Sequence, residues 1–239
     1  MKNYENLIIE YCKENRVSTT EVADALGKQG VLPLAKPLNV GHYKVGRVFP
    51  VFTAYGSNYE VHDQILAVSK NDIVMIFTHK CDGLAIFGEL VSKFLLFYQK
   101  ASAVVVHGLV RDLAKLKREN YAIWSEGNTP LGCKNNQMSR GYPGKKRKEI
   151  LNNYAGSIAI CDDGGVTIIK KEYVNQDTLE RLKRIELQED IWSFCLDTLK
   201  WDTKKIICEK AYLEEQEFLV KSHIAQFDEL NKGFDRSDE

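Results

Sequence analysis

No apolar run in this sequence is long enough to cross a lipid bilayer as a helix. The longest uninterrupted apolar stretches, such as Ile73–Phe77 and Ala103–Val106, have the length of β-strands. The N-terminal residues MKNYENLIIEYCKEN also lack the long apolar core of a signal peptide. We therefore expect a cytoplasmic protein that has no membrane partner.

An excess of charge of either sign is also absent, because Lys+Arg and Asp+Glu both number 33. Proteins that bind the phosphate backbone usually carry a basic excess, so the composition argues against a nucleic-acid partner. The exception is local, because the stretch Lys134–Lys148 ends in the basic sequence GKKRK. Contact with RNA is one interpretation of this stretch, and an exposed, solvated loop is the one that we favour.

The cysteines form no CxxC motif and no cluster with histidine. Their spacing argues against a zinc site and against a compact disulfide framework, so we expect reduced thiols. The six cysteines are Cys12, Cys81, Cys133, Cys161, Cys195 and Cys208.

Alternating helices and strands are predicted from hydrophobic periodicity and turn residues. Helices are expected over residues 4–12, 62–70, 87–100 and 110–119, and another begins at Ser18, Thr19 or Thr20 and ends at Gly27 or Gly30. Strands are expected over 44–54, 72–78, 103–106 and 121–125, with a strand–turn–strand over 157–169. Such alternation is typical of an α/β layered fold.

Beyond this α/β part the chain changes to a helical pattern, which starts near Asn175. A further helix is expected over 203–230 and a polar tail over 231–239. We therefore expect an α/β domain over 1–172 and a C-terminal helical extension over 173–239. The apolar residues at helical spacing in this extension are Leu179, Leu182, Ile185, Ile191, Phe194 and Leu199.

The segments that can carry chemistry lie between residues 81 and 135. A glycine-containing turn, Asp82–Leu90, enters a helix, and a buried strand ends in His107–Asp112. Both are places where backbone amides can point at an anion. A third segment, Thr129–Gly132, reads TPLG.

Arg111 and Asp112 stand side by side just after the buried strand, where ligands gather in layered α/β folds. The arginine offers a planar fork that fits a carboxylate. The aspartate offers a hard oxygen ligand that suits Mg2+ or Mn2+. A surface ion pair between the two side chains is the alternative, and it is the commoner role of adjacent Arg and Asp.

Taken together, these segments resemble the RraA-like family. That family contains regulators of ribonuclease E and the 4-hydroxy-4-methyl-2-oxoglutarate and 4-carboxy-4-hydroxy-2-oxoadipate aldolases. The resemblance covers roughly residues 18–170, and Cys81-Asp82-Gly83 and Trp124-Ser125 favour the aldolase branch. The motifs that carry it are TTEVADALGKQGVLP, VGRVF, GELV, VVVHGLVRD, TPLG and AICDDGGV.

The resemblance implies a swivelling β/β/α domain, assembled as a trimer or a dimer of trimers with sites between subunits. It implies that Arg111 holds the carboxylate of a 2-oxo acid and that Asp112 holds a divalent metal, Mg2+ or Mn2+. Gly88 and the backbone amides of Leu90 and Val91 would complete the carboxylate pocket, and Glu89 would stand near the waters of the metal.

The chain departs from the family pattern at three places. Glu89 and Arg111 enclose one residue more than the family has, and His107 replaces a residue that is often aspartate. For His107 we favour a hydrogen-bonded residue at a strand end over a catalytic role. Asn152–Ser157 stands in place of a Pro-Gly-Asp turn. In the aldolases a carboxylate from the C-terminal helix of a neighbour approaches the site. Glu186 and Glu189 are the candidates for it here, and for both we favour a position on a solvated helix face.

The implied activity is that of a lyase, which releases pyruvate from a 4-hydroxy-2-oxo acid and decarboxylates oxaloacetate as a related reaction. A divalent cation at Asp112 would stabilise the developing enolate. The alternative is a non-catalytic RraA-like regulator that docks on a ribonuclease or another protein. Asp112 favours the enzyme, because regulators of this family can lack an acid after the arginine.

Overall fold

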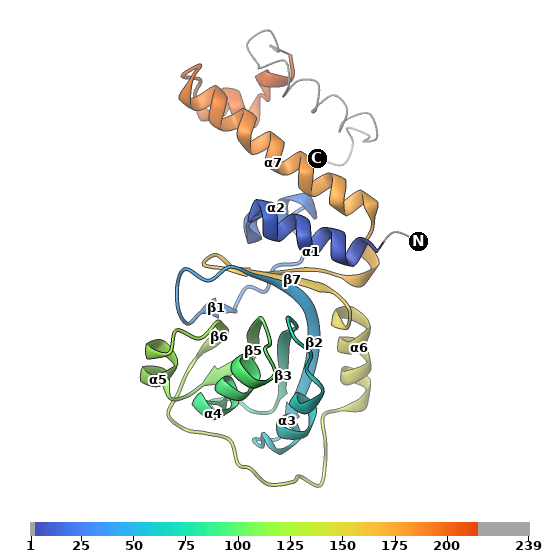
Figure 1. Ribbon diagram of the computed structural model, residues 1–239, viewed down its shortest axis with the longest axis vertical. Helices are drawn as coiled ribbons and strands as arrows, with labels where there is room; N and C mark the ends of the chain where they lie inside the picture. The colour runs from blue at the N-terminus through green and yellow to red at the C-terminus, as the bar shows by residue number, and fades with distance from the viewer. Residues whose placement is uncertain (1–2, 215–239) are drawn as a thin grey trace.

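The computed structural model describes residues 3–214, which form an eight-stranded mixed sheet with helices on both sides (Figure 1). The strand order is β1-β6-β5-β3-β2-β7-β8, and β4 pairs with β5. All pairs among strands β2 to β6 are parallel. The pairs β1–β6, β2–β7 and β7–β8 are antiparallel. The strands are β1 (Lys36–Pro37), β2 (Lys44–Ala54), β3 (Ile73–His79), β4 (Ala85–Phe87), β5 (Ala103–Val110), β6 (Ile123–Asn128), β7 (Ile158–Asp162) and β8 (Gly165–Ile169).

The helices cover both faces of this sheet. The α-helices are α1 (Tyr4–Asn15), α2 (Thr19–Ala25), α3 (Tyr59–Gln64), α4 (Glu89–Lys93), α5 (Leu113–Arg118), α6 (Gly144–Tyr154) and α7 (Gln176–Asp197). Short 3-10 turns cover Ile65–Ala67, Lys171–Tyr173 and Ala211–Leu213, and π-helical turns cover Phe94–Tyr98 and Lys204–Cys208. No helix of residues 3–214 is long and apolar enough to span a membrane.

The central strands are buried on both faces, as expected for the parallel part of a layered fold. Along β3, Val74 and Ile76 pack under α3, α4 and α5, whereas Met75 and Phe77 pack on the side of α6. Each fully buried side chain of this size stabilises the fold by about 1.5–3 kcal/mol. The packing of this buried centre therefore fixes the positions of the strand termini and of the loops that follow them.

A third layer forms where α1, α2 and α7 lie on β7 and β8, away from α3, α4 and α5 (Figure 1). Ile8, Val22 and Leu182 share one apolar cluster there, and the Tyr11 hydroxyl donates a hydrogen bond to Glu186. The N-terminal half of α7 is thus held by the helices that open the chain.

Most sequence predictions for the first 128 residues are confirmed. Strand β2 has the predicted bounds, and α2 begins after Ser18, whose side chain forms a reciprocal capping box with Glu21. Gly27 follows the helix in the left-handed region, with φ +66°. The α/β fold and the helix after Asn175 are confirmed too.

Three predicted helices have different bounds. The helix predicted over 62–70 begins at Tyr59 and ends with a 3-10 turn at Ala67, because the Asp72 side chain accepts from the Ser69 amide and holds a loop there. The helix predicted over 87–100 starts only after Gly88. The helix predicted over 110–119 starts at Leu113, because Val110 still pairs with both β4 and β6.

Two further predictions are wrong. The stretch 134–148 is not a loop throughout, because the basic residues 145–148 belong to α6, where Arg147 lies over the Phe52 ring. A continuous helix from residue 203 is also wrong, because Lys210 takes the left-handed conformation (φ 51°) and separates two short turns. The rest of that predicted helix and the polar tail lie outside the described residues.

Candidate functional site

Arg111 and Asp112 lie where the parallel strands β4, β5 and β6 end together. The Arg111 amide donates to the Phe87 carbonyl at 3.0 Å, and the Thr129 amide donates to the Val110 carbonyl at 3.0 Å. These bonds hold the three segments singled out in the sequence side by side. The carboxyl edge of a layered sheet is where such folds bind ligands.

Gly88 gives Asp112 its position. A Cβ atom at Gly88 would lie 2.1 Å from Asp112 Oδ2 and 2.9 Å from Arg111 Cγ, so no other residue fits there without movement. The Glu89 amide donates to Asp112 Oδ2 at 3.0 Å. Asp112 itself lies in the left-handed region (φ 60°, ψ 32°), a conformation that aspartate tolerates better than most residues. The backbone therefore turns this carboxylate toward the start of α4.

Gly132 gives the Arg111 side chain its position in the same way. A Cβ atom at Gly132 would lie 2.5 Å from Arg111 Nη1 and 3.2 Å from Cζ. Within residues 3–214 the guanidinium has no carboxylate partner, Asp112 included. The alternative of an Arg111–Asp112 ion pair is therefore not what the structure shows. The TPLG motif marked this segment in the sequence, but the contact of its glycine with the guanidinium was not predicted.

A cavity of about 400 Å³ opens beside the two residues. Arg111 and Asp112 are exposed in the single chain, so the cavity faces solvent. The sequence predictions missed half of its lining, namely the start of α5 and the last residue of β6. The lining residues are Arg111, Asp112, Leu113, Ala114, Lys115, Asn128, Thr129 and Pro130.

The first turn of α4 adds donors. Amides at the start of a helix have no partner within the helix, and those of Leu90 and Val91 belong to this turn. The Leu90 side chain is 80% exposed, whereas Val91 is buried. The Glu89 carboxylate lies near Tyr121, whose pKa is raised first by burial and then by the negative charge of Glu89. Of the predicted residues 88–91, the structure places Gly88 and the Glu89 amide directly beside Asp112.

The donor set fits a hard divalent cation. One Asp112 oxygen accepts from the Glu89 amide, and the other is left for a ligand. No group of three His, Cys, Asp or Glu residues that could hold a metal occurs within residues 3–214. A single carboxylate suits Mg2+ or Mn2+, which keep most of their waters and complete the shell with substrate oxygens.

His107 is not brought to this site. It lies within β5 rather than at its end, because the strand continues to Val110. Its ring stacks on Phe77 at 4.8 Å between centroids, on the α6 side of the sheet, and Nδ1 lies 3.7 Å from Glu126 Oε1. Burial lowers the pKa of His107, which favours the neutral ring.

Glu186 and Glu189 lie on α7, far from α5 within one chain (Figure 1). The Glu186 carboxylate accepts the Tyr11 hydroxyl. Burial raises the pKa of both carboxyls. Neither residue takes part in the Arg111 site of its own chain.

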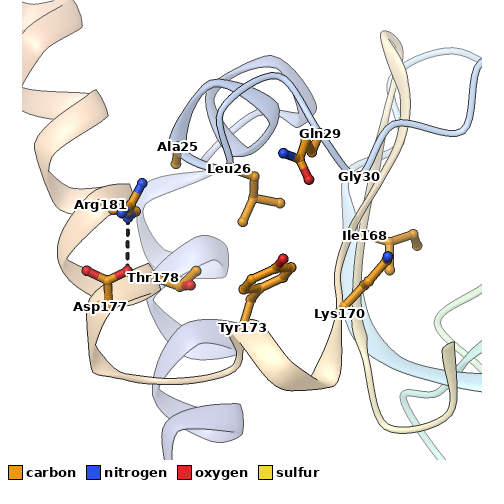
Figure 2. A pocket seen from close by; sticks show the side chains of 10 residues that line it. All are labelled: Ala25, Leu26, Gln29, Gly30, Ile168, Lys170, Tyr173, Asp177, Thr178 and Arg181. Carbon is orange, nitrogen blue, oxygen red and sulfur yellow. Dashed lines mark hydrogen bonds and ion pairs between the residues drawn. The ribbon is translucent and has the colours of Figure 1, made fainter. Parts of the chain in front are cut away.

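A second cavity, of about 200 Å³, lies between α2, β8 and α7 (Figure 2). It also contains an arginine, but Arg181 Nε donates to Asp177 Oδ2 at 2.9 Å, as the dashed line in Figure 2 shows. Leu26 and the Tyr173 ring form much of its wall. The charge of Arg181 is therefore paired with an acid of the same helix.

The family model of RraA-like proteins, Aldolase/RraA, matches residues 19–174, which is more than half of the chain. The chain belongs to this family. The matched region includes the Arg111 site and all strands of the sheet.

Two curated relatives have low identity to this RraA-like chain. Protein DlpA of Legionella pneumophila is 24% identical over 197 residues, which cover 77% of this chain and 31% of DlpA. A provisionally named 4-hydroxy-4-methyl-2-oxoglutarate aldolase of Halalkalibacterium halodurans is 25% identical over 211 residues, which cover 83% of this chain and 91% of that protein. The chain thus spans about a third of DlpA and nearly all of the second relative.

Solved structures show the same fold. An uncharacterized protein from Pseudomonas syringae pv. tomato has a TM-score of 0.61 and 20% identity, over 77% of this chain and 85% of that one. RraAS2 of Streptomyces coelicolor, an unusual member of the RNase ES inhibitor RraA protein family, has a TM-score of 0.56 and 16% identity, over 74% and 91%. The expected RraA-like α/β fold with a C-terminal helix is therefore confirmed.

Proposed function

We propose that this protein is a metal-dependent lyase of the class II pyruvate-aldolase type, which cleaves a 4-hydroxy-2-oxo acid and releases pyruvate. The observation that supports this most is the Arg111 guanidinium, which lacks an acidic partner within residues 3–214 and lies beside the Asp112 carboxylate at a cavity. The aldolase name of the Halalkalibacterium halodurans relative supports the same reaction class.

Arg111 is the residue that would hold the substrate carboxylate. Its planar fork can form two parallel hydrogen bonds with a carboxylate, and Gly132 fixes the orientation of that fork. The first-turn amides of Leu90 and Val91 would add neutral donors next to it. Because these donors are positioned before the substrate arrives, little ordering remains to be done on binding.

Asp112 would hold Mg2+ or Mn2+, and the Glu89 amide keeps its carboxylate turned toward the site. Such a cation, when bound, stabilises negative charge that develops on the 2-oxo group. Glu89 is the residue whose amide donates to this carboxylate, and we assign its own side chain to carrying the reaction proton.

The reaction balances without a redox partner. The 4-hydroxyl loses its proton, the C3–C4 bond breaks to give a carbonyl product, and the electron pair of that bond remains as the pyruvate enolate. Protonation at C3 then gives pyruvate. Oxaloacetate would lose CO2 instead of the carbonyl product and reach the same enolate, so one Arg111 site can serve both reactions.

The proposed assembly is a closed cyclic homo-oligomer, most simply a trimer, with sites between subunits. Arg111 and Asp112 are exposed in the single chain, and a neighbour that covers them would exclude water from the reaction. Light scattering at assay concentration tests this. A uniform monomer of the 27.3 kDa chain mass that still released pyruvate would contradict a site shared between subunits.

Release of pyruvate from oxaloacetate tests the activity. We expect turnover with Mg2+ or Mn2+, its loss with EDTA and its return when the metal is restored. Asp177→Asn, in the second cavity, is the matched control and should retain full activity. Absence of metal-dependent release by correctly folded protein, from oxaloacetate and from 4-hydroxy-4-methyl-2-oxoglutarate, would reject the lyase in favour of a non-catalytic regulator.

A further inference from the structure

The cavity between α2, β8 and α7 has features of a ligand site that the proposed lyase activity does not use (Figure 2). Part of its polar lining comes from the short 3-10 turn that joins β8 to α7. Lys170 precedes this turn and Tyr173 ends it, and the Tyr173 amide donates to the Lys170 carbonyl at 2.8 Å. The turn therefore places a cation and an aromatic ring at the edge of one cavity.

The walls of this cavity are held by backbone contacts. The Ile168 amide of β8 donates to the Gly30 carbonyl at 2.9 Å, and a Cβ atom at Gly30 would lie 2.5 Å from the Ile168 oxygen. Across the cavity in Figure 2, Thr178 is buried at the start of α7, and its amide donates to the Asn175 side chain at 3.0 Å. The cavity is therefore formed before any ligand arrives.

The charged side chains of the cavity leave one positive charge in excess. They are two cations, Lys170 and Arg181, and one carboxylate, Asp177. Arg181 pairs with Asp177, whereas Lys170 forms no ion pair within residues 3–214. A single excess positive charge matches a monoanion such as a carboxylate better than a phosphate monoester, which carries a charge of about −1.5 to −2 at neutral pH.

The apolar part of the lining favours a flat, ring-shaped ligand. Ala25, Leu26, Ile168 and the Tyr173 ring contribute this part, and aromatic rings pack well against one another. An apolar cavity of about 150 Å³ holds a benzene ring. The volume of about 200 Å³ is therefore sufficient for one ring with a carboxylate. Pockets for drug-sized ligands begin at roughly 300 Å³, so a nucleotide is too large.

We propose that this cavity is a binding site for an aromatic monocarboxylate, separate from the Arg111 site. The Lys170 ammonium group holds the carboxylate, and the ring of the ligand lies against Leu26 and the Tyr173 ring. The Gln29 amide and the Tyr173 hydroxyl, which also belong to the lining, can form hydrogen bonds with a polar substituent on that ring. The site thus combines one charge contact with an apolar slot for a single ring.

Calorimetric titration of the full-length protein with benzoate tests the proposal without reference to lyase activity. We expect saturable binding of benzoate. Benzyl alcohol has the same ring without the charge, and it should bind at least about tenfold more weakly, because a hydrogen bond to a charged group is stronger than one between neutral groups. This comparison uses wild-type protein alone. Equal affinities for the two compounds, or no binding at roughly 10 mM benzoate, would overturn the proposal.

Three variants assign the binding to this cavity. Lys170→Gln should weaken benzoate binding by at least about tenfold. Lys171→Gln, at an exposed neighbour outside the cavity, is the matched control and should change the affinity less than about twofold. Arg111→Gln removes the other candidate partner for a carboxylate, and the Lys170-dependent binding should persist in it. Wild-type affinity in Lys170→Gln, or a loss of binding confined to Arg111→Gln, would contradict the assignment.

Discussion

Two cavities of this protein each contain an arginine and an aspartate, and the two arginines differ in their surroundings. Arg181 donates to Asp177 at 2.9 Å, one helical turn away on α7 (Figure 2). Arg111 has Asp112 as its neighbour in the chain, but it forms no ion pair with it or with any other acid of residues 3–214. Glycines contact Arg111 and Asp112 instead.

This difference distinguishes a candidate binding site from an ion pair that only stabilises a helix. Residues four apart on a helix meet with no special backbone, so the Arg181 pair is local and only partly exposed to a ligand. Arg111 and Asp112 require a left-handed residue and two close glycine contacts to take their places. Charges that the fold positions without an ion-pair partner among the described residues are available to an anion and a cation from outside.

The comparison predicts its largest effect for Arg111→Lys. We expect kcat/KM for pyruvate release to fall by at least about a hundredfold, equivalent to about 2.7 kcal/mol, because an ammonium group cannot form the planar fork. Arg181→Lys is the matched control and should change kcat/KM less than about twofold, since it keeps the charge in a local surface pair. Equal losses in the two variants would remove the distinction between the cavities.

A smaller loss is expected for metal binding by Asp112→Asn. Asparagine tolerates the left-handed backbone and can still accept from the Glu89 amide, so the fold should persist. We expect Mn2+ affinity to fall by more than about tenfold, since even the loss of an outer-shell partner has that effect. Calorimetric titration with Mn2+ measures it, with Asp177→Asn as control. Unchanged affinity would mean that Asp112 is not the ligand.

Gly132→Ala should have a moderate effect on substrate binding. The added Cβ would overlap Arg111 Nη1, so the guanidinium must shift and KM should rise by about fivefold with a smaller change in kcat. Gly144→Ala is the control, because a Cβ there meets nothing within 4 Å. Steady-state kinetics of both variants decide the point, and an unchanged KM in Gly132→Ala would show that this contact does not orient Arg111.

The smallest expected effect is on stability, and it comes from Glu186 on α7, far from the Arg111 site. Burial raises the pKa of Glu186 above its ordinary 4.5, although the Tyr11 hydrogen bond opposes this. The folded state then binds this proton more tightly than the unfolded state, so the contribution of Glu186 to stability is fully present below pH 4.5 and is lost as pH rises through the raised pKa. Glu186→Gln should reduce this fall. Urea unfolding between pH 4.5 and 7 measures it, and an identical pH dependence in the variant would show that Glu186 does not contribute.

The sequence predicted the fold well where local rules decide structure. The Ser18–Glu21 capping box and the apolar run of β2 were recognisable because capping and alternation are local signals. The basic stretch 145–148 was misassigned because its helix depends on packing against the sheet, through Arg147 on Phe52 and Tyr154 on Phe77. Long-range contacts of that kind leave no periodic pattern in the sequence.

The site was predictable in part. The family resemblance named residues 88–91, Arg111 and Asp112, and the structure brings Gly88 and the Glu89 amide next to the last two. The roles of Leu90 and Val91 stay a prediction. The role of Gly132 depends on how segment 131–134 passes between Ala85 and Gly56, which spacing alone does not encode.

The structure gives the C-terminal apolar residues a different role from the one that their spacing suggests. Their helical spacing favours a subunit interface, because exposed apolar patches often mark one. In the structure, however, Leu182 and Ile191 are fully buried within the chain, and Phe194 and Leu199 pack in an internal cluster. A chain truncated after Lys171 would uncover α1 and α2. Any loss of assembly in that truncation must therefore be compared with the loss of folding.

The central claim is that Arg111 and Asp112, which are exposed and form no ion pair within residues 3–214, make a metal-dependent pyruvate-releasing site. The most direct measurement is pyruvate release from oxaloacetate by wild-type protein and by Arg111→Lys, each with Mn2+ and with EDTA. The account predicts turnover for wild-type protein with metal and a loss of at least about a hundredfold in the other three conditions. Equal turnover by wild-type protein with Mn2+ and with EDTA, or by the two proteins with Mn2+, would contradict it.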